Sequence, residues 1–323
     1  MKALTAPLPS EKSAGGGLRC SAEQGKSAGK CRMGGWVDGT GGMGNGSRIR
    51  KINSLLADLD VRLADGDAYR AEQERLRAFE ARGGLDAPAY ALSPGMDGFD
   101  ISLLVSDYGD HEDALACLMG GGGAAGYAPE NGYFDSPDAE ALYLMVRRAR
   151  PQRVIEVGCG NSTRITRQAI IDGGLNTTLT AVDPWPRADV ADVVDRFEQA
   201  TVESLEPSMF AELAEGDILF IDSSHQVRMS NDVAHLFCRI IPALAPGVII
   251  HVHDVFLPYE YPKRFFYDCP SWAEQYMLHA LLQGGGYEIL WPGYFLQQER
   301  PDAVAALPFL ATGRAQSFWI RKR

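Results

Sequence analysis

Short apolar runs separated by amphipathic stretches dominate the second half of the chain. An apolar run bounded by turn residues predicts a buried strand, and apolar residues spaced three and four apart predict a helix. Alternation of the two is typical of a largely parallel sheet covered by helices on both faces. The predicted strands are 153–158, 178–183, 217–222, 247–253, 287–291 and 316–321, with a weaker one near 199–202, and the predicted helices are 161–172, 189–197, 229–241 and 271–283.

The two ends of this pattern add further expectations. No convincing helical pattern separates 287–291 from 316–321, so these two strands are expected to pair antiparallel. Before the first strand, Ser136-Pro137-Asp138 resembles a helix start with a cap, an early proline and an acidic first turn, and the helix should run to about Arg148. The sequence therefore predicts an α/β, doubly wound fold in which one helix precedes the first strand.

The first part of the chain has a different composition. Residues 1–47 are rich in Gly, Ser, Lys and Ala and are predicted to be a disordered basic tail. Residues 48–128 are predicted to be a helical region and linker, with a flexible connection at the glycine run 120–123, and the α/β domain spans 129–323. The helix over 49–79 is predicted from the apolar positions Ile49, Ile52, Leu56, Leu59, Leu63, Leu76 and Phe79.

The 49–79 helix has two interpretations. Its apolar stripe can pack on the chain's own domain, or it can form the contact of a homodimer. The stripe is too short for a coiled coil to be the first choice, and Gly66 interrupts it. Packing on its own domain is therefore favoured, with the homodimer as the alternative.

Charge and cysteine content exclude several classes of protein. The net charge is −11, and the first 53 residues hold nine of the 31 Lys and Arg but three of the 42 Asp and Glu. The remainder is thus strongly acidic, which argues against a nucleic acid partner, because phosphate binding needs a basic surface. Six cysteines without a C-x-x-C pair fit a reducing cytoplasm, and no apolar run is long enough to span a membrane. We expect a cytoplasmic protein that acts on a small molecule.

The segment Arg153–Thr163, RVIEVGCGNST, joins the first predicted strand to a helix through a G-x-G turn. This is where a doubly wound sheet binds a nucleotide-like ligand. A dinucleotide site would have a third glycine where Thr163 stands, and Glu156 would repel a pyrophosphate. S-adenosylmethionine has no phosphate, and Glu156 can favour its cationic methionine end. The predicted cofactor contacts in this segment are Glu156, Gly158, Cys159, Gly160, Asn161 and Ser162.

Two residues at the end of the second predicted strand extend this site. Asp183 can accept hydrogen bonds from both ribose hydroxyls, although it can also serve as a turn residue before Pro184. Trp185 can lie against the adenine ring, although it can also be an ordinary packing aromatic. Both residues are predicted to bind the cofactor.

In these and later segments the chain resembles bacterial class I methyltransferases of methyltransferase family 24. The resemblance covers about 130–323 and rests on NGYF, VIEVGCGNST, GDILFIDSSH, GVIIHVHDVFLPYEYP, WAEQY and SFWIRK. It implies a Rossmann-like seven-stranded sheet with a reversed last strand, S-adenosylmethionine as methyl donor, and a place for Asp222 near the cofactor. Asp183 departs from the family, where Glu is expected, and the first 84 residues have no recognised counterpart.

The reacting groups are expected at the carboxyl ends of the fourth and fifth strands. His225 and His253 are the candidates for a general base, since imidazole titrates near neutrality, and Asp254 can orient an imidazole or the substrate. His251 lies inside a strand and is expected to be a core residue. These His and Asp side chains could also hold a divalent metal, as in some related sugar methyltransferases, but their spacing matches no metal signature, so no metal ligand is predicted.

Together these observations predict a methyltransferase that uses S-adenosylmethionine and methylates a small molecule. We expect the acceptor atom to be a hydroxyl oxygen, and the family suggests a secondary metabolite or a sugar. Two alternatives remain open at this point. One is a nicotinamide-dependent oxidoreductase, and the other is a non-catalytic assembly subunit that keeps the cofactor fold and recruits a partner through 49–79.

Overall fold

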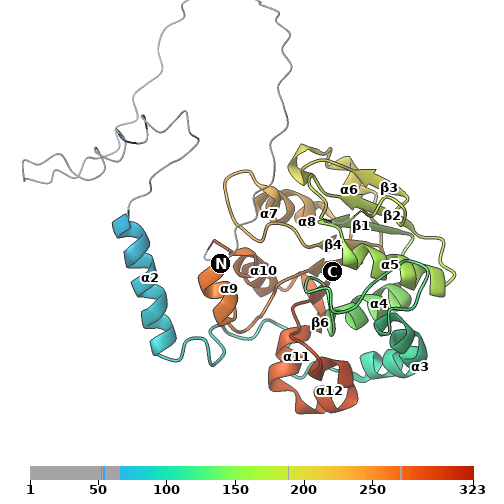
Figure 1. Cartoon of the computed structure of the whole chain (residues 1–323), viewed down its shortest axis with the longest axis horizontal. Helices are drawn as coiled ribbons and strands as arrows, with labels where there is room; N and C mark the ends of the chain where they lie inside the picture. The colour runs from blue at the N-terminus through green and yellow to red at the C-terminus, as the bar shows by residue number, and fades with distance from the viewer. Residues whose placement is uncertain (1–51, 53, 55–65, 188, 270) are drawn as a thin grey trace, which may run out of the picture. The chain divides into compact units, whose positions relative to one another are not determined.

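The structure, a computed structural model, describes residues 52, 54, 66–187, 189–269 and 271–323 (Figure 1). Residues 66–323 form one unit by their internal contacts. The predicted disordered tail and most of the 49–65 part of the predicted helix lie outside the described residues. The domain boundaries at 47/48 and 128/129 stay predictions.

The described residues form a seven-stranded sheet in the order β3-β2-β1-β4-β5-β7-β6. β7 is antiparallel to both of its neighbours, and the other neighbouring strands are parallel. The predicted doubly wound fold with a reversed last strand is therefore confirmed. The strands are β1 (Arg153–Val157), β2 (Thr178–Val182), β3 (Arg196–Glu198), β4 (Ile218–Ile221), β5 (Ile249–Val252), β6 (Tyr287–Pro292) and β7 (Phe318–Lys322).

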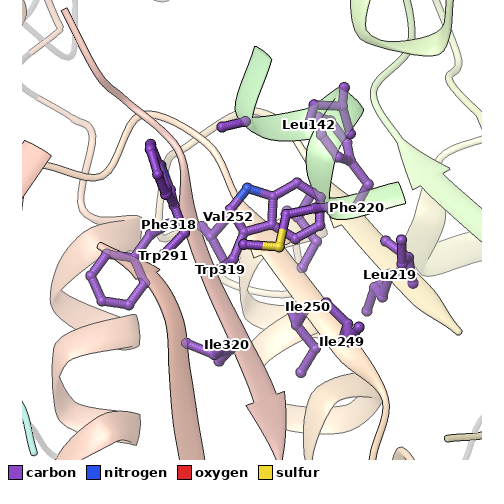
Figure 2. Packing of buried hydrophobic residues seen from close by; sticks show 14 of the residues in the cluster. Leu142, Leu219, Phe220, Ile249, Ile250, Val252, Trp291, Phe318, Trp319 and Ile320 are labelled. Carbon is purple, nitrogen blue, oxygen red and sulfur yellow. The ribbon is translucent and has the colours of Figure 1, made fainter. Parts of the chain in front are cut away.

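The central strands are buried because both faces of the sheet are covered. All four residues of β4 and of β5 are buried, as the apolar runs predict for parallel strands between two helical layers. Figure 2 shows side chains of β4, β5 and β7 meeting Leu142, which comes from α4 (Asp138–Ala149). Figure 1 shows α4 and α5 (Asn161–Asp172) on one side of β1 and β4, and α7 (Asp232–His235) and α8 (Ile241–Ala243) on the other.

Most predicted helices are present at or near their predicted bounds. α5 matches the prediction 161–172, and α4 begins two residues after Ser136. A continuous helical stretch of α7, a π-helical segment (Leu236–Ile240) and α8 replaces the predicted 229–241, and Asn231 caps its start by accepting a hydrogen bond from the Ala234 N–H. α10 (Glu274–Gln283) matches the end of the predicted 271–283.

The predicted helix 189–197 is wrong, and the weak strand expected near 199–202 lies earlier. The described residues there form turns followed by β3, and a 3₁₀ turn follows at Val202–Ser204. Arg164 donates to the Asp189 carbonyl, and Arg167 donates to the Val193 carbonyl. Side chains of α5 thus hold the backbone of this segment in its turns. The tertiary contacts therefore override the local pattern.

The expectation that no helix separates the last two strands is also wrong. α11 (Gly293–Glu299), α12 (Pro301–Ala306) and a 3₁₀ turn (Pro308–Ala311) lie between β6 and β7. Prolines at the first positions of the second and third pieces restart the helix each time, which keeps every piece too short for a clear periodic pattern. The predicted antiparallel pairing of β6 and β7 nevertheless holds.

The region before the sheet is helical, as predicted, but its elements differ. α2 (Gly66–Ala81) begins at Gly66, and α3 (Ser102–Met119) occupies a region that the sequence described only as mixed. Leu76 of α2 is buried in an aromatic cluster with Phe256, Tyr261 and Phe266, and Phe79 packs against that cluster. This part of the predicted helix thus packs on its own domain, and the homodimer stays a prediction.

The remaining helices are α6 (Ser208–Ala211) and α9 (Lys263–Asp268). No helix in the described part of the chain is long and apolar enough to cross a membrane. The carboxyl ends of β1, β2, β4 and β5 lie at one edge of the sheet because these strands are parallel. The predicted site residues follow these ends, so this edge is where a functional site has to be sought.

Candidate functional site

The turn after β1 is shaped by its two glycines for different reasons. Gly158 has a φ of +82°, and a Cβ there would lie 1.9 Å from the carbonyl oxygen of Asp222. Glycine is needed at this position because the loop after β4 passes directly against it. A Cβ at Gly160 would meet nothing within 4 Å among the described residues. The backbone at Gly160 is therefore open on the side where a side chain would stand.

Asp183 joins the turn after β1 to the turn after β2. Its two carboxylate oxygens accept hydrogen bonds from the backbone N–H of Cys159 at 3.1 Å and of Trp185 at 2.8 Å. Its Oδ2 also accepts a hydrogen bond from the Cys159 thiol at 3.7 Å. Asp183 is therefore a turn residue, and its Oδ1 keeps a lone pair for a further donor. The Trp185 side chain is 80% exposed at this rim, which rules out the alternative of an ordinary packing aromatic.

Glu156 lies one residue before the end of β1 and is a buried carboxyl group with an incomplete set of partners. The residue is 1% exposed, and its Oε1 accepts a hydrogen bond from the Ser162 hydroxyl at 2.5 Å. Its Oε2 has no hydrogen-bond partner among the residues that the structure describes. Burial raises the pKa of Glu156 to about 8. A cation placed at Oε2 would satisfy this atom and favour the ionised carboxylate.

His225 follows β4 and is surrounded by carboxylates. Its Nδ1 lies 2.9 Å from Oε2 of Glu274, and its Nε2 lies 3.3 Å from both Oδ1 of Asp222 and Oδ2 of Asp254. Burial alone would lower the pKa of His225, but the hydrogen bonds to Asp222 and Glu274 and the charge of Asp254 raise it well above its ordinary value. In this environment His225 is an imidazolium held by three carboxylates.

His253 follows β5 and has the opposite environment. The residue is 3% exposed, and neither ring nitrogen has a hydrogen-bond partner within the described residues. Its ring lies 4.8 Å from the ring of Phe134 and 5.6 Å from the ring of His251. A buried polar ring without a partner is costly, and such groups require an explanation in a native fold.

His251 is a core residue, as expected. It is fully buried, its ring stacks on Phe220 at 3.9 Å, and its Nε2 lies 3.0 Å from the Ser317 hydroxyl. Burial lowers its pKa well below the ordinary value, and the neighbouring His253 acts in the same direction. The neutral ring therefore belongs to the packing between β4, β5 and β7.

Two residues of this edge adopt backbone conformations that side chains rarely take. The φ angle is +58° at His225 and +55° at Asp254. Left-handed backbone at a non-glycine residue costs about 1–3 kcal/mol and concentrates at functional sites. The two residues face each other across the pair of strand ends, so the strain is found where the candidate reacting groups meet.

Asp222, His225 and Asp254 could hold a divalent cation. One ligand atom from each residue lies within 4.8 Å of the others. Two carboxylate oxygens and one imidazole nitrogen suit Mn²⁺ or Mg²⁺ completed by further oxygen ligands. The same three side chains also satisfy one another as an ion pair when His225 is protonated. The residues thus fit a metal, although they do not require one.

A family model described as a methyltransferase domain matches residues 155–255. This segment runs from β1 to the loop after β5, and it contains the G-x-G turn and both candidate histidines. The chain contains a class I methyltransferase domain.

Several solved structures are similar to the methyltransferase domain. Cofactor-bound Rv0187 from MTB is 17% identical with a TM-score of 0.39, over 72% of this chain and 98% of that one. The O-methyltransferase TomG from Streptomyces achromogenes, solved with SAM, is 14% identical with a TM-score of 0.35, over 87% and 99%. Likeness at these scores supports no inference about the activity of this chain. No curated protein matches it.

Sequence reasoning missed two residues of the methyltransferase domain that contact the candidate histidines. Phe134 lies against His253, and Glu274 binds His225. Both are in motifs noted only for their resemblance, NGYF and WAEQY. The available signal for Glu274 was a carboxylate at a predicted helix start, but its partner is 49 residues away in sequence. Such a pairing becomes visible only when the helix is placed beside the strand ends.

Proposed function

We propose that the protein transfers a methyl group from S-adenosylmethionine to a hydroxyl oxygen of a small molecule, for example a secondary metabolite or a sugar. The observation that carries this proposal is the buried, unpartnered Oε2 of Glu156, on the strand that leads into the G-x-G turn. A cationic amino acid end would satisfy that oxygen, whereas a phosphate would be repelled by it. The site is therefore suited to a donor that carries an ammonium and a sulfonium.

The remaining donor contacts follow from this placement. Glu156, with Ser162 behind it, would hold the ammonium, and Asp183 would accept a ribose hydroxyl through a lone pair that the turn leaves free. Trp185 would cover the adenine, and Asp222 would approach the reacting end. The backbone at Gly158, Cys159, Gly160 and Asn161 would line the donor on its other side.

A nicotinamide cofactor fits these residues less well. Thr163 is fully buried, and its hydroxyl accepts a hydrogen bond from the Gly160 N–H at 2.9 Å. A dinucleotide turn would keep that N–H for a phosphate and place a glycine at position 163. The occupied N–H and the carboxyl of Glu156 both disfavour an oxidoreductase.

His253 is the better candidate for the general base. A base must accept a proton, and the three carboxylates keep His225 protonated. Neither nitrogen of His253 has a partner within the described residues, so both are free for an acceptor hydroxyl. In the proposed step His253 takes the hydroxyl proton, the oxygen attacks the methyl carbon, and the carbon–sulfur bond breaks to leave a neutral thioether. Asp254 would orient the imidazolium of His225.

A divalent cation between Asp222, His225 and Asp254 is an alternative form of the same function. These residues would hold it, and it would lower the pKa of a bound hydroxyl group. Turnover after dialysis against a chelator, with and without added Mg²⁺ or Mn²⁺, separates the two forms. Full activity in the chelated protein supports the form without a metal. Activity that returns only when the metal is added supports the form with a bound metal instead.

Calorimetric titration with S-adenosylhomocysteine tests the donor assignment. We expect saturable binding by the wild type, and a large loss of affinity in Glu156→Ala. Glu288→Ala is the matched control, because Glu288 is an exposed carboxylate on β6 that pairs with Arg321. No heat with S-adenosylhomocysteine, together with binding of NADH followed by fluorescence, would overturn the proposal in favour of the oxidoreductase.

A further inference from the structure

The first turn of α10, within the WAEQY segment (residues 272–276), holds the loop that carries His225. The backbone N–H groups of Ala273 and Glu274 both donate to the carbonyl oxygen of His225, at 2.9 and 3.2 Å. The Trp272 ring lies 4.5 Å from the His225 ring, and Trp272 also forms an isolated bridge with Gln226. The backbone of His225 is therefore bound by the start of a helix that belongs to another part of the chain.

The same turn also holds the loop that carries Asp254. Gln275 is fully buried, and its Oε1 accepts a hydrogen bond from the Phe256 N–H at 3.0 Å. Its Nε2 donates to the Tyr259 carbonyl at 3.4 Å. One helix start thus ties together the loops after β4 and β5, which supply the two residues that face each other with strained backbones.

Glu274 adds a side-chain contact to this backbone clamp. The residue is 1% exposed, and its Oε2 lies 2.9 Å from Nδ1 of His225. Burial raises the pKa of Glu274, and the hydrogen bond to His225 lowers it. When Glu274 is ionised it can only accept, so the proton of this hydrogen bond then sits on Nδ1. With Nδ1 fixed in this way, Nε2 points to Asp222 and Asp254, each 3.3 Å away.

A purely structural role does not account for this carboxylate. The two backbone hydrogen bonds and the Trp272 contact already hold the loop. Burying a charged group costs several kcal/mol, and an apolar side chain would usually stabilise a fold as well or better. A carboxylate at this point is explained by what it does to the imidazole ring: it fixes the orientation of the ring through Nδ1–H, as carboxylates do at working histidines.

We propose that Glu274 is the positioning residue of the site: it keeps the proton on Nδ1 of His225 and presents Nε2 to the space between Asp222 and Asp254. The proposal rests on the proposed function only in taking that space as part of the reacting site. The role of Glu274 is the same whether a proton or a divalent cation lies at Nε2. Its substitution should therefore change the ring of His225 and turnover while leaving donor binding unchanged.

The test is imidazole nitrogen NMR on full-length protein labelled with ¹⁵N-histidine, which has six histidines to assign. His225→Gln identifies the His225 signals. We expect the wild type to show a downfield, slowly exchanging Nδ1–H for His225. Glu274→Ala should lose this signal, and Glu274→Gln, which keeps an acceptor oxygen of the same shape, should retain it in part.

Glu140→Ala is the matched control for the loss of a buried glutamate. Glu140 also lies in the first turn of a helix, α4, is buried, and accepts a hydrogen bond from the Ser136 hydroxyl. It should leave the His225 signal unchanged, even if it lowers the unfolding temperature. If Glu274→Ala keeps the wild-type Nδ1–H signal, or if Glu140→Ala abolishes it equally, the proposal is overturned.

Two further measurements separate this inference from the donor assignment. Titration with S-adenosylhomocysteine should give affinities within about twofold for wild type, Glu274→Gln and Glu274→Ala. With an acceptor methylated by the wild type, kcat of Glu274→Ala should fall about 10–100-fold at nearly constant KM for the donor, with partial recovery in Glu274→Gln. If Glu274→Ala loses the NMR signal but the wild type does not bind S-adenosylhomocysteine, the proposed function is wrong and the role of Glu274 stands.

Discussion

His225 and His253 follow neighbouring strands at the same edge of the sheet, yet the protein treats them in opposite ways. Every ring nitrogen of His225 faces a carboxylate, and Asp222, Asp254 and Glu274 together hold it as an imidazolium. His253 is as deeply buried, but within the described residues it has a phenylalanine ring and no hydrogen-bond partner for either nitrogen. Burial of an unpaired polar group is unfavourable, so the environment of His253 lowers the stability of the fold and must be offset by other interactions.

The difference teaches which groups build the site and which are left for ligands. Groups whose hydrogen bonds are complete, such as His225, fix the shape of the strand ends. His253 and Oε2 of Glu156 are among the buried groups without partners, and in the proposed reaction they are the two that bind substrates. Within the described residues, His253 has no hydroxyl group that could give it a proton, and the carboxyl group of Glu156 has no cation beside it. Methyl transfer from a cationic donor to a hydroxyl supplies both missing partners.

The largest expected effect comes from removing the unpartnered histidine. His253→Ala should lower kcat by about 10²–10⁴-fold, because the acceptor hydroxyl loses its base. The affinity for S-adenosylhomocysteine should stay within about twofold, since the donor contacts lie on β1 and β2. Formation of S-adenosylhomocysteine with a panel of phenolic and sugar acceptors measures the first, and calorimetry the second. If His253→Ala keeps wild-type turnover, His253 is not the base.

Matched leucine substitutions at the two histidines should separate them by stability. His225→Leu leaves Glu274, Asp222 and Asp254 without a cation and should destabilise the chelated protein by about 3–5 kcal/mol. His253→Leu removes a polar ring that has no partner, without opening a cavity, and should be neutral or slightly stabilising. Urea unfolding measures both free energies. Equal losses for the two variants would contradict the distinction between a partnered and an unpartnered histidine.

Much of this architecture was visible in the sequence, because its signals are local. The bounds of α5 follow from apolar periodicity and from the G-x-G turn that borders it. The antiparallel pairing of β6 and β7 was predicted correctly, although from an absence of helix that the structure contradicts. The 189–197 prediction failed because Arg164 and Arg167 of α5 bind backbone carbonyls there, which is a contact between distant elements. α11 and α12 were missed because proline restarts keep them short.

The candidate site divides in the same way. Parallel strands with polar residues at their ends were enough to bring His225, His253 and Asp254 to one edge. What separates the two histidines is supplied from elsewhere, by Glu274 at the start of α10 and by Phe134 before α4. Neither contact has a spacing rule in the sequence. The place of the candidate site was therefore predictable, and the hydrogen-bond partners of its histidines were not.

The incomplete carboxyl group of Glu156 should make stability depend on pH. Its pKa is raised from an ordinary 4.5 to about 8 in the folded protein. Folding therefore favours the protonated form, and between pH 4.5 and 8 the free energy of unfolding of the wild type should fall relative to Glu156→Gln, by at most about 1.4 kcal/mol per pH unit. Urea unfolding of both proteins at pH 5, 6, 7 and 8 measures the difference.

Ligand binding sharpens the Glu156 prediction. Saturating S-adenosylhomocysteine brings an ammonium to Oε2, so the decline of wild-type stability with pH should become shallower in its presence. Other titrating groups contribute equally to both proteins and cancel in the difference. Parallel pH curves for wild type and Glu156→Gln would show that the carboxyl group is not held protonated by burial.

The smallest effect is expected at Trp185, an aromatic side chain that is exposed to solvent. Its side chain is 80% exposed, so Trp185→Ala should change the free energy of unfolding by less than about 0.5 kcal/mol. If the ring stacks on adenine, the substitution removes about 1 kcal/mol of binding, or roughly fivefold in the affinity for S-adenosylhomocysteine. Met229→Ala is the control, because Met229 is as exposed but follows β4. Unchanged affinity in Trp185→Ala, or an equal loss in Met229→Ala, would mean that this exposed aromatic is not reserved for the donor.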